Sequence, residues 1–429
     1  MANDFSKEER VMFDSMLERF DNTLVASRCA LTVNTDQVMM ERTNDIVWYP
    51  QPYIMPTYSG NDATTAFSKD VAQLSVPASI NMQKHGAFTL TARQLRDQQQ
   101  SERIGKGIIQ KLANDIDIDI TNGVGALGSV VVKRTVAATG FDDIALCESL
   151  LTEQGVGNDD RVYLANTRDY NNMAGNIAKP QTSANPLVTT AYTKAKVSDD
   201  VAGFGLFKTA NAYRQAATVA GTTPTMNGAN QYYVPVGSTL TVGRGNLNVD
   251  NRFQTINVTL GAGAAWVVGS AFTIAGVNAV NHITKADTGQ LKTFRLVSIT
   301  SGGGTSGANV WVITPPIISA QGATGPELQY QNVTATPAAA AALVPLNTVS
   351  TLVNPFWQGD AVQIFPGRLA PAPNSGLATM TGTTDTGFGL LMTRQGEINT
   401  LTTKYRFDAI WGTLIAQPEM AGIELFSQT

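Results

Sequence analysis

Residues 218–345 place the tightest constraint on the fold of this 429-residue chain. Short runs of β-branched and aromatic residues recur through this stretch, and glycine-rich turns separate them. Several short strands at close spacing are typical of a small barrel or sandwich. The sequence therefore predicts a separate β-domain at 218–345, inserted in a larger mixed body. The clearest runs are Tyr232–Val236, Arg252–Leu260, Phe272–Ile274, Thr293–Thr300 and Val310–Thr314.

Charge falls steeply between the N-terminal region and this β-rich stretch. Residues 1–120 contain 28 charged side chains, whereas residues 215–345 contain 8. Charged residues make up 15% of the whole chain, against about 25% in a typical soluble protein. The 43% of hydrophobic residues is ample for a buried core, which excludes wholesale disorder. Low charge fits a protein that packs against copies of itself, and the net charge of −4 does not favour tight nucleic-acid binding.

Two helices are predicted in the N-terminal part of the chain. The first lies within residues 1–30, where a capping-box pattern at Ser6 precedes apolar residues at helical spacing. Its other face is acidic and includes Asp14 and Glu18. Such an amphipathic arm needs a packing partner, either its own domain or another protein. The second and longest helix is predicted from Thr91 to about Ile116.

Cysteine and histidine usage argues against several kinds of site. Cys29 and Cys147 are the only cysteines, and their spacing fits neither a disulfide framework nor a zinc site. His85 and His282 lie in different sequence contexts, and we expect no catalytic dyad from them. The charged N-terminus lacks the apolar core of a signal peptide, and no apolar run is long enough to span a bilayer. We expect a chain that folds in a reducing cytoplasm, without contact with a membrane.

Two motif-like patterns are interpreted as structure. Gly123–Gly128 matches G-x-G-x-x-G, but the predicted helix precedes it and a strand follows, the reverse of a dinucleotide site. It is predicted to be a helix stop and turn. Asp115, Asp117 and Asp119 resemble the start of a calcium loop that lacks its glycine and its final acid. They are predicted to form a polar face where the helix gives way to an extended segment. No pattern indicates catalysis, a metal or a cofactor.

A set of short segments, in order over nearly the whole chain, resembles the major coat proteins of short-tailed phages (podoviruses) of enteric bacteria. The most specific of them is Asn248–Phe253, inside the β-rich stretch. The others are Asn44–Pro50, Leu90–Asp97, Lys111–Asn114, Val201–Phe204, Phe272–Val277, Gln395–Leu401 and Pro418–Gly422.

The resemblance implies an α+β fold, the tailed-phage coat (Johnson) fold, with an inserted all-β barrel domain. Its parts are an N-terminal arm, an extended loop, a long spine helix, and peripheral and axial domains. The expected N-terminal helical arm is 1–30, and the peripheral domain is 31–125. Within the peripheral domain, the extended loop is expected at about 52–82 and the spine helix at about 91–120. The first part of the axial domain is expected at 126–217, the barrel at 218–345, and the C-terminal part of the axial and peripheral domains at 346–429.

The resemblance also implies a function and partners. The chain is expected to self-assemble as pentamers and hexamers, with a scaffolding protein, into an icosahedral shell that packages double-stranded DNA without reading its sequence. A portal protein is the remaining expected partner, and the shell would be assembled in the host cytoplasm. Another virion component, such as a tail or decoration protein, is the alternative, and an enzyme is a weaker one.

Three groups of residues are the expected contact sites. Asp14 and Glu18 are the candidate dock for a basic helix of the scaffold. The turn before Asn248 is often acidic in relatives and reaches a neighbouring capsomer, whereas here its only charge is Arg244. The residues expected to contact that neighbour are Arg244, Asp250 and Arg252, and the densest basic groups for DNA are Arg93, Arg96, Arg103 and Lys106.

Overall fold

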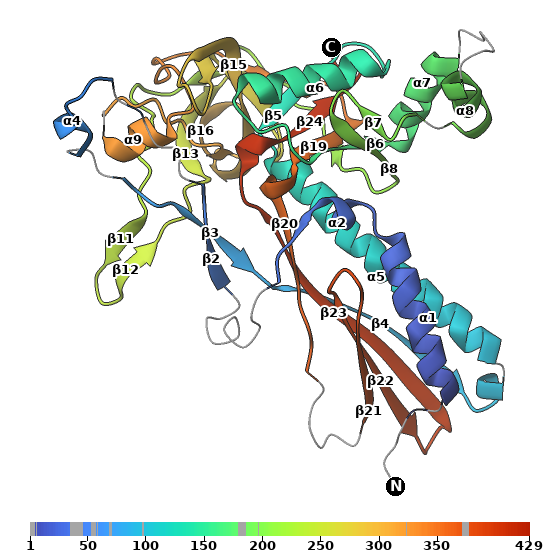
Figure 1. The fold of residues 1–429 in the computed structure, drawn as a ribbon. Helices are drawn as coiled ribbons and strands as arrows, with labels where there is room; N and C mark the ends of the chain where they lie inside the picture. Colours follow the sequence, from blue (N-terminus) through green and yellow to red (C-terminus); the bar gives the residue numbers. More distant parts are fainter. Residues whose placement is uncertain are drawn as a thin grey trace. The chain divides into compact units, whose positions relative to one another are not determined.

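The computed structural model describes residues 5, 7–34, 46–52, 57, 59–67, 71–96, 98–178, 186–195, 197–322, 324–370 and 377–429. The chain forms two compact units (Figure 1). The first unit comprises Met1–Val47, Ala78–Ile120 and Gln363–Leu414, and the second comprises Trp48–Pro77, Thr121–Val362 and Ile415–Thr429. Each unit is therefore built from segments that are far apart in the sequence.

The first unit contains a six-stranded sheet whose strands pair in the order β1–β20–β23–β22–β21, and β4 pairs with β23 outside this order. Strand β4 pairs in antiparallel register with β23 from Thr91 opposite Thr402 to Met82 opposite Trp411. The strands are β1 (Leu31–Thr32), β4 (Met82–Thr91), β20 (Val362–Pro366), β21 (Ala378–Thr383), β22 (Gly389–Glu397) and β23 (Thr402–Ile415).

Helix α1 (Lys7–Thr23) packs its apolar side onto this sheet. Phe13, Met16 and Phe20 are buried, and Phe13 lies against Gly382 of β21, where a larger residue would collide with it. The short helix α2 (Ala26–Cys29) follows. The predicted arm therefore finds its partner within its own unit. The capping residue Ser6 lies outside the described residues.

The spine helix α5 spans Gln98–Leu127, so it begins later and ends later than predicted. The Thr91 backbone N–H donates to Gln94 Oε1 at 3.0 Å, and this bond closes a turn between β4 and the 3₁₀ turn η1 (Gln94–Arg96). The capping pattern was therefore real, but it belongs to a turn and not to the start of the helix.

The C-terminal end of α5 corrects two further predictions. Gly125 is helical and lies against the ring of Tyr213, so close packing, and not a turn, requires a glycine there. Asp115, Asp117 and Asp119 are also helical, and the three do not share one partner. Asp117 is buried and accepts hydrogen bonds from the backbone N–H groups of Val25 at 2.8 Å and Ser27 at 3.1 Å, while the other two lie near Lys84.

The second unit has a central sheet in the order β5–β24–β19–β6–β8–β7. Its core includes the rings of Tyr163, Phe204 and Phe356, whose centroids lie 6.1–6.4 Å apart. The elements of this region are β5 (Val130–Lys133), α6 (Phe141–Glu153), β6 (Arg161–Asn166), α7 (Thr167–Ala178), α8 (Pro186–Lys194), β7 (Asp200–Val201), β8 (Phe204–Thr209), β19 (Asn354–Gln358), the 3₁₀ turn η3 (Pro418–Met420) and β24 (Ala421–Leu425).

Of two strands that pair with each other, the first precedes the segment predicted as an extended loop at about 52–82, and the second lies inside that segment. They are β2 (Ile46–Pro50) and β3 (Ser75–Ser79), and the short helix α4 (Thr64–Phe67) lies between them in the sequence.

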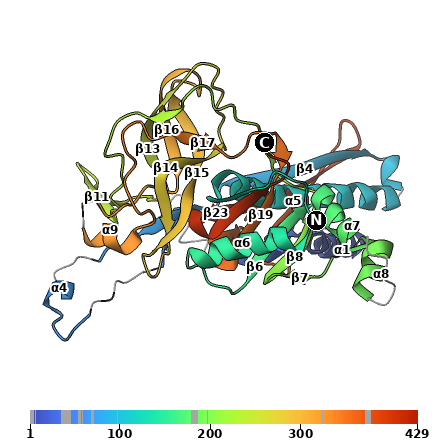
Figure 2. The same ribbon diagram turned by 90° about the horizontal axis from the view of Figure 1, so that it is seen from above.

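The inserted domain is a barrel of antiparallel strands in the order β10–β13–β16–β15–β14–β17 (Figure 2). The first and last strands of this order are also joined, because Met226 N–H donates to the Ala341 carbonyl at 2.9 Å and Leu343 N–H donates to the Pro224 carbonyl at 2.9 Å. These hydrogen bonds nearly close the barrel around a core that includes Trp266. Its strands are β10 (Thr225–Met226), β13 (Gln254–Leu260), β14 (Ala271–Val280), β15 (Asp287–Ser301), β16 (Gly307–Thr314) and β17 (Leu343–Pro345).

Of the predicted strand runs, Tyr232–Val236 is wrong. This segment forms no strand because Pro235 has no N–H to donate to a neighbouring strand. The Val236 N–H donates instead to the side chain of Asn251 at 3.0 Å, so the run is held as an irregular segment along the barrel wall.

We expect residues 218–345, expressed alone, to fold. Backbone hydrogen bonds beside β10 and β17 nearly close the strand order and leave little unpaired sheet edge, and about 130 residues bury enough apolar surface to be stable without disulfides. The fragment should be soluble, give a β-type circular dichroism spectrum and melt cooperatively. A fragment that aggregates, or that shows no melting transition, would contradict this expectation.

Candidate functional site

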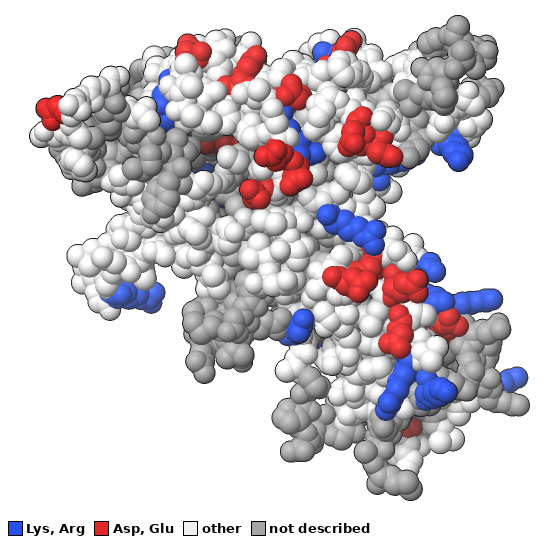
Figure 3. All heavy atoms as spheres, in the orientation of Figure 1, with Lys and Arg blue, Asp and Glu red and all other residues white. Residues whose placement is uncertain are grey.

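A largely exposed feature of the inserted domain is a hairpin of β11 (Ser238–Thr241) and β12 (Gly245–Asn248). Its turn contains Arg244 between Gly243 and Gly245, which have φ values of +83° and +77° that a residue with a side chain rarely adopts. Val242 is 98% exposed. The hairpin therefore presents apolar side chains and one basic group to its surroundings. In Figure 3 much of the visible surface is uncharged, and the charged groups on it lie in small clusters.

The other two residues predicted for this contact lie at the base of the hairpin. Arg252 Nη2 lies 2.6 Å from Asp250 Oδ2, and Arg252 Nη1 donates to the Ile415 carbonyl at 2.9 Å. These bonds fasten the base of the hairpin to its own unit. Of the three predicted residues, Arg244 is the one whose charge lies at the exposed tip.

The acidic side of α1 divides into two groups. Glu9 is bound to Arg394 at 2.7 Å, and Asp21 accepts a hydrogen bond from the Asp385 backbone N–H at 2.9 Å. Asp14 and Glu18 are exposed and form no hydrogen bond or ion pair within the described part of the chain. Among the described acidic side chains of this helix, they are therefore the ones that remain available for another molecule.

The basic groups predicted to face DNA are less concentrated than expected. Arg93 lies in the turn before η1, and not on the spine helix. On α5, Lys106 pairs with Glu102, while Arg103 is exposed. The side chain of Arg96 lies outside the described residues. The three of these basic side chains that the structure describes, Arg93, Arg103 and Lys106, form no continuous basic stripe.

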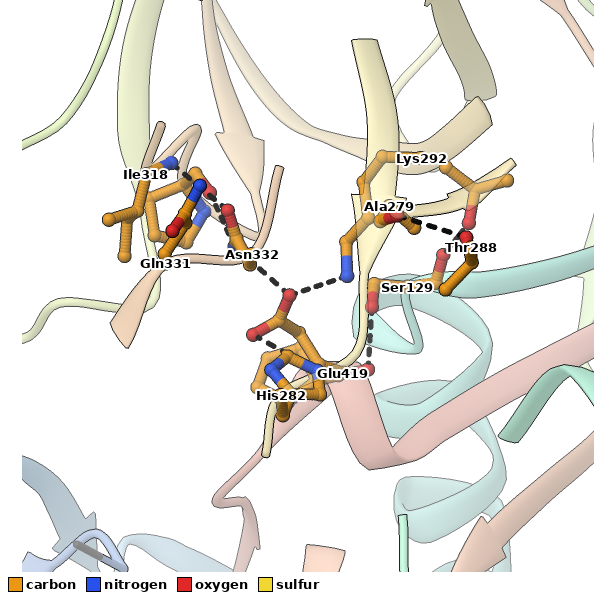
Figure 4. A network of polar contacts seen from close by, with 12 residues as sticks. Ser129, Ala279, His282, Thr288, Lys292, Ile318, Gln331, Asn332 and Glu419 are labelled. Atoms are coloured by element: carbon orange, nitrogen blue, oxygen red, sulfur yellow. Dashed lines mark hydrogen bonds and ion pairs between the residues drawn. The ribbon is translucent and has the colours of Figure 1, made fainter. Parts of the chain in front are cut away.

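A buried network that the sequence did not indicate joins the barrel to η3 of the second unit (Figure 4). Glu419 Oε1 lies 2.6 Å from Lys292 Nζ and accepts a hydrogen bond from Asn332 Nδ2 at 3.0 Å. His282 Nε2 lies 3.9 Å from Glu419 Oε2. We call these four residues the joint.

The charge state of the joint follows from its surroundings. Burial favours the neutral form of Glu419, but Lys292, His282 and the hydrogen bonds from Lys292 and Asn332 outweigh it and lower the pKa of Glu419 to about 2. Burial lowers the pKa of His282 to about 4, so this imidazole is neutral at pH 7. The joint is thus a single buried ion pair with a neutral histidine beside it.

A second buried polar group lies in the central sheet. The Tyr163 hydroxyl donates to Glu424 Oε2, and burial raises the pKa of Glu424 to about 8. Burial also raises the pKa of the neighbouring Cys147 thiol well above its usual range. Both groups are protonated at pH 7, so this cluster is neutral and inside the core.

The described residues do not assemble a reactive centre. Burial raises the pKa of Cys29 to about 12, which disfavours a thiolate at either cysteine. His85 is exposed on β4 of the first unit, while His282 is buried in the second. Among the residues described, no group of three or more His, Cys, Asp or Glu side chains is arranged to hold a metal ion. None of the described helices is long and apolar enough to cross a membrane.

Comparison with known proteins identifies the family. The profile of the P22 coat protein family (gene protein 5) matches residues 1–427. The chain is similar to the CUS-3 coat protein I-domain, with 36% identity over 30% of this chain and 99% of that one and a TM-score of 0.22. A structure from Mycobacterium phage Che8 shares 10% identity over 96% of this chain and 92% of that one, with a TM-score of 0.42. The mature capsid of bacteriophage PhiM1 shares 5% identity over 93% and 86%, with a TM-score of 0.42.

The family match fits the architecture described above. The structure combines helices and strands and contains an N-terminal helix, a long spine helix and an inserted β-barrel, which are parts that the resemblance implied for the α+β Johnson fold. The match spans these parts without interruption, so it does not rest on one domain alone. This chain therefore belongs to the P22 coat protein family.

Proposed function

We propose that this chain is the major capsid protein of a tailed phage and that its pentamers and hexamers, formed with a scaffolding protein, close into an icosahedral shell around double-stranded DNA. The observation that carries the proposal is the family match over residues 1–427. The low charge supports it, because most of a coat protein's surface becomes interface, where charged residues are depleted. The role is structural and needs no cofactor.

Purification and microscopy test this function directly. The chain coexpressed with the scaffolding protein of its phage should sediment as closed shells that negative-stain images resolve as round particles. Rings or fibres would favour a tail component, and a compact oligomer without shells would contradict a capsid role.

We propose further that the β11–β12 hairpin contacts a neighbouring capsomer through Arg244 and the apolar side chains beside it. Replacement of Arg244 by Glu reverses the only charge of the hairpin and should lower the yield of shells several-fold, with subunit folding unchanged because the side chain is exposed. The matched control is Arg168→Glu, at an exposed arginine of α7 in the same unit. The yield of shells from a sucrose gradient would measure the effect. Equal yields for the two variants would show that the charge of Arg244 does not contribute to the contact.

Asp14 and Glu18 are our proposed dock for the scaffolding protein. Exposed ion pairs contribute only about 0–1 kcal/mol each, so the contact should be weak, multivalent and salt-sensitive. The double variant Asp14→Ala and Glu18→Ala should give folded subunits that incorporate little scaffold. The control removes the exposed carboxylates Asp142 and Asp159 of the second unit. Normal scaffold content in shells of the Asp14 and Glu18 variant would place the dock elsewhere.

The remaining partners follow from the shell. We propose that a portal protein occupies one vertex, that assembly takes place in the host cytoplasm, and that the DNA is contained without sequence readout. The net charge of −4 and the scattered basic groups support only weak, salt-sensitive contact between the inner surface and DNA.

A further inference from the structure

A cavity of about 240 Å³ lies beside the joint, within the second unit. The barrel contributes Ile283, Pro316 and Ile318 to its walls, while Leu74 precedes β3 and Met420 belongs to η3. The walls are therefore largely apolar and come from three parts of the chain that are distant in sequence. An apolar cavity of about 150 Å³ is enough to bind benzene, so this one has room for a molecule with two fused rings.

Among the polar side chains that line this cavity, Glu419 offers a carboxylate oxygen that is not hydrogen-bonded to the protein. Its Oε1 is already bound to Lys292 and Asn332, whereas its Oε2 lies 3.9 Å from His282 Nε2, beyond hydrogen-bond range. The side chain is 23% exposed and lines the cavity. One carboxylate oxygen is thus left to accept a hydrogen bond from a molecule inside the cavity.

The surrounding charges select a neutral ligand. Lys292 already balances the charge of Glu419, and Arg252 on the cavity wall is balanced by Asp250. Lys285, whose Nζ donates to the Gln331 carbonyl at 3.1 Å, adds a further positive group nearby, which opposes a cationic ligand. The carboxylate itself opposes an anion. A neutral molecule that donates one hydrogen bond meets neither penalty, because it satisfies the free oxygen without bringing an unpaired charge into a partly enclosed, largely apolar site.

We propose that this cavity is a binding site for a small, neutral, fused-ring aromatic molecule that donates one N–H or O–H to Glu419 Oε2. Such a ligand touches the barrel, η3 and the segment before β3 at once, so it braces the inserted domain against its host. Since the ligand binds only the folded state, it stabilises the second unit in proportion to its concentration above the dissociation constant. This site is separate from the hairpin and from the acidic face of α1.

Indole is a suitable probe, and indene, which has nearly the same size but no N–H, is its matched control. With the purified full-length subunit, titrations followed by NMR should give an affinity for indole about ten-fold higher than for indene, the value of one buried hydrogen bond. The chain has two histidines, so the imidazole signals report the place of binding. The His282 signals should move with indole, and those of His85 should not.

Variants that fill the cavity complete the test. Ile318→Trp should abolish the indole-dependent shift of His282, whereas Val268→Trp, at a position 55% exposed on the barrel and outside the cavity lining, should leave it unchanged. If Ile318→Trp does not fold, Ile283→Trp serves instead, because Ile283 lines the cavity and is 71% exposed. Equal affinity for indole and indene, no indole binding, or a shift that survives the filling variant would each overturn the proposal.

Discussion

Replacement of Lys292 by Met should destabilise the second unit by up to about 3 kcal/mol, because it leaves the Glu419 carboxylate, which is largely removed from water, without its ion-pair partner. The Lys292 side chain is only 1% exposed, so water does not readily take its place. Urea unfolding followed by tryptophan fluorescence would measure the loss as a lower midpoint. The matched control is Lys194→Met, at an exposed lysine of the same unit, which should change the midpoint little.

The double variant Lys292→Met and Glu419→Gln separates a lost ion pair from a packing defect. Removal of both charges takes away the unpaired buried carboxylate, so the double variant should be more stable than Lys292→Met alone, with a coupling of at least about 1 kcal/mol. If the two substitutions are simply additive, the Lys292–Glu419 pair does not hold the barrel to η3 in the way described.

Replacement of Glu424 by Gln should stabilise the protein at alkaline pH and have little effect at acidic pH. Burial raises the pKa of Glu424 from 4.5 to about 8, so the folded state keeps its proton where the unfolded state has lost it. The wild-type stability from this group is therefore fully present below pH 4.5, falls as pH rises, and is lost once pH passes about 8. Glutamine needs no proton and still accepts the hydrogen bond from Tyr163.

The expected gain of the Glu424→Gln variant at pH 8.5 is on the order of 4–5 kcal/mol, with near equality at pH 4.5. Thermal melts over this pH range would show the two curves diverging as pH rises. Glu153→Gln, at an exposed position on α6, is the control, and its melting temperature should change with pH as that of the wild type does. If Glu424→Gln also runs parallel to the wild type, the carboxyl group of Glu424 is ionised in the folded state.

Local sequence patterns predicted the inserted barrel well because its strands alternate between core and solvent. In β13 (Gln254–Leu260) every second residue is buried, and this period of two is readable without any knowledge of the neighbouring strands. The prediction failed at Tyr232–Val236, where a distant side chain, Asn251, takes the place of a strand partner. The residue types in Tyr232–Val236 alone could not reveal that a side chain replaces a strand as the hydrogen-bond partner.

The spine helix shows the same limit at both ends. Thr91 and Gln94 make the hydrogen bonds expected of a helix cap, but the pairing of β4 with β23 keeps Thr91 in a strand. At the other end, Gly125 was read as a helix stop because the ring of Tyr213, which requires a glycine there, is distant in the sequence. The pair Lys292–Glu419 was missed for this reason too, since each residue is unremarkable within its own segment.

The closure of the barrel also bears on the order in which the chain folds. Host strands β9 (Arg214–Gln215) and β18 (Thr351–Leu352) pair with each other across the whole insertion. If the insertion were still unfolded, that pairing would have to close a very long loop. Once β10 and β17 are hydrogen-bonded neighbours, the same two host strands are separated by only a short effective path. A roughly ten-fold shorter loop lowers the entropy cost of loop closure by about 2 kcal/mol. Folding of the barrel should therefore favour the later pairing of β9 with β18.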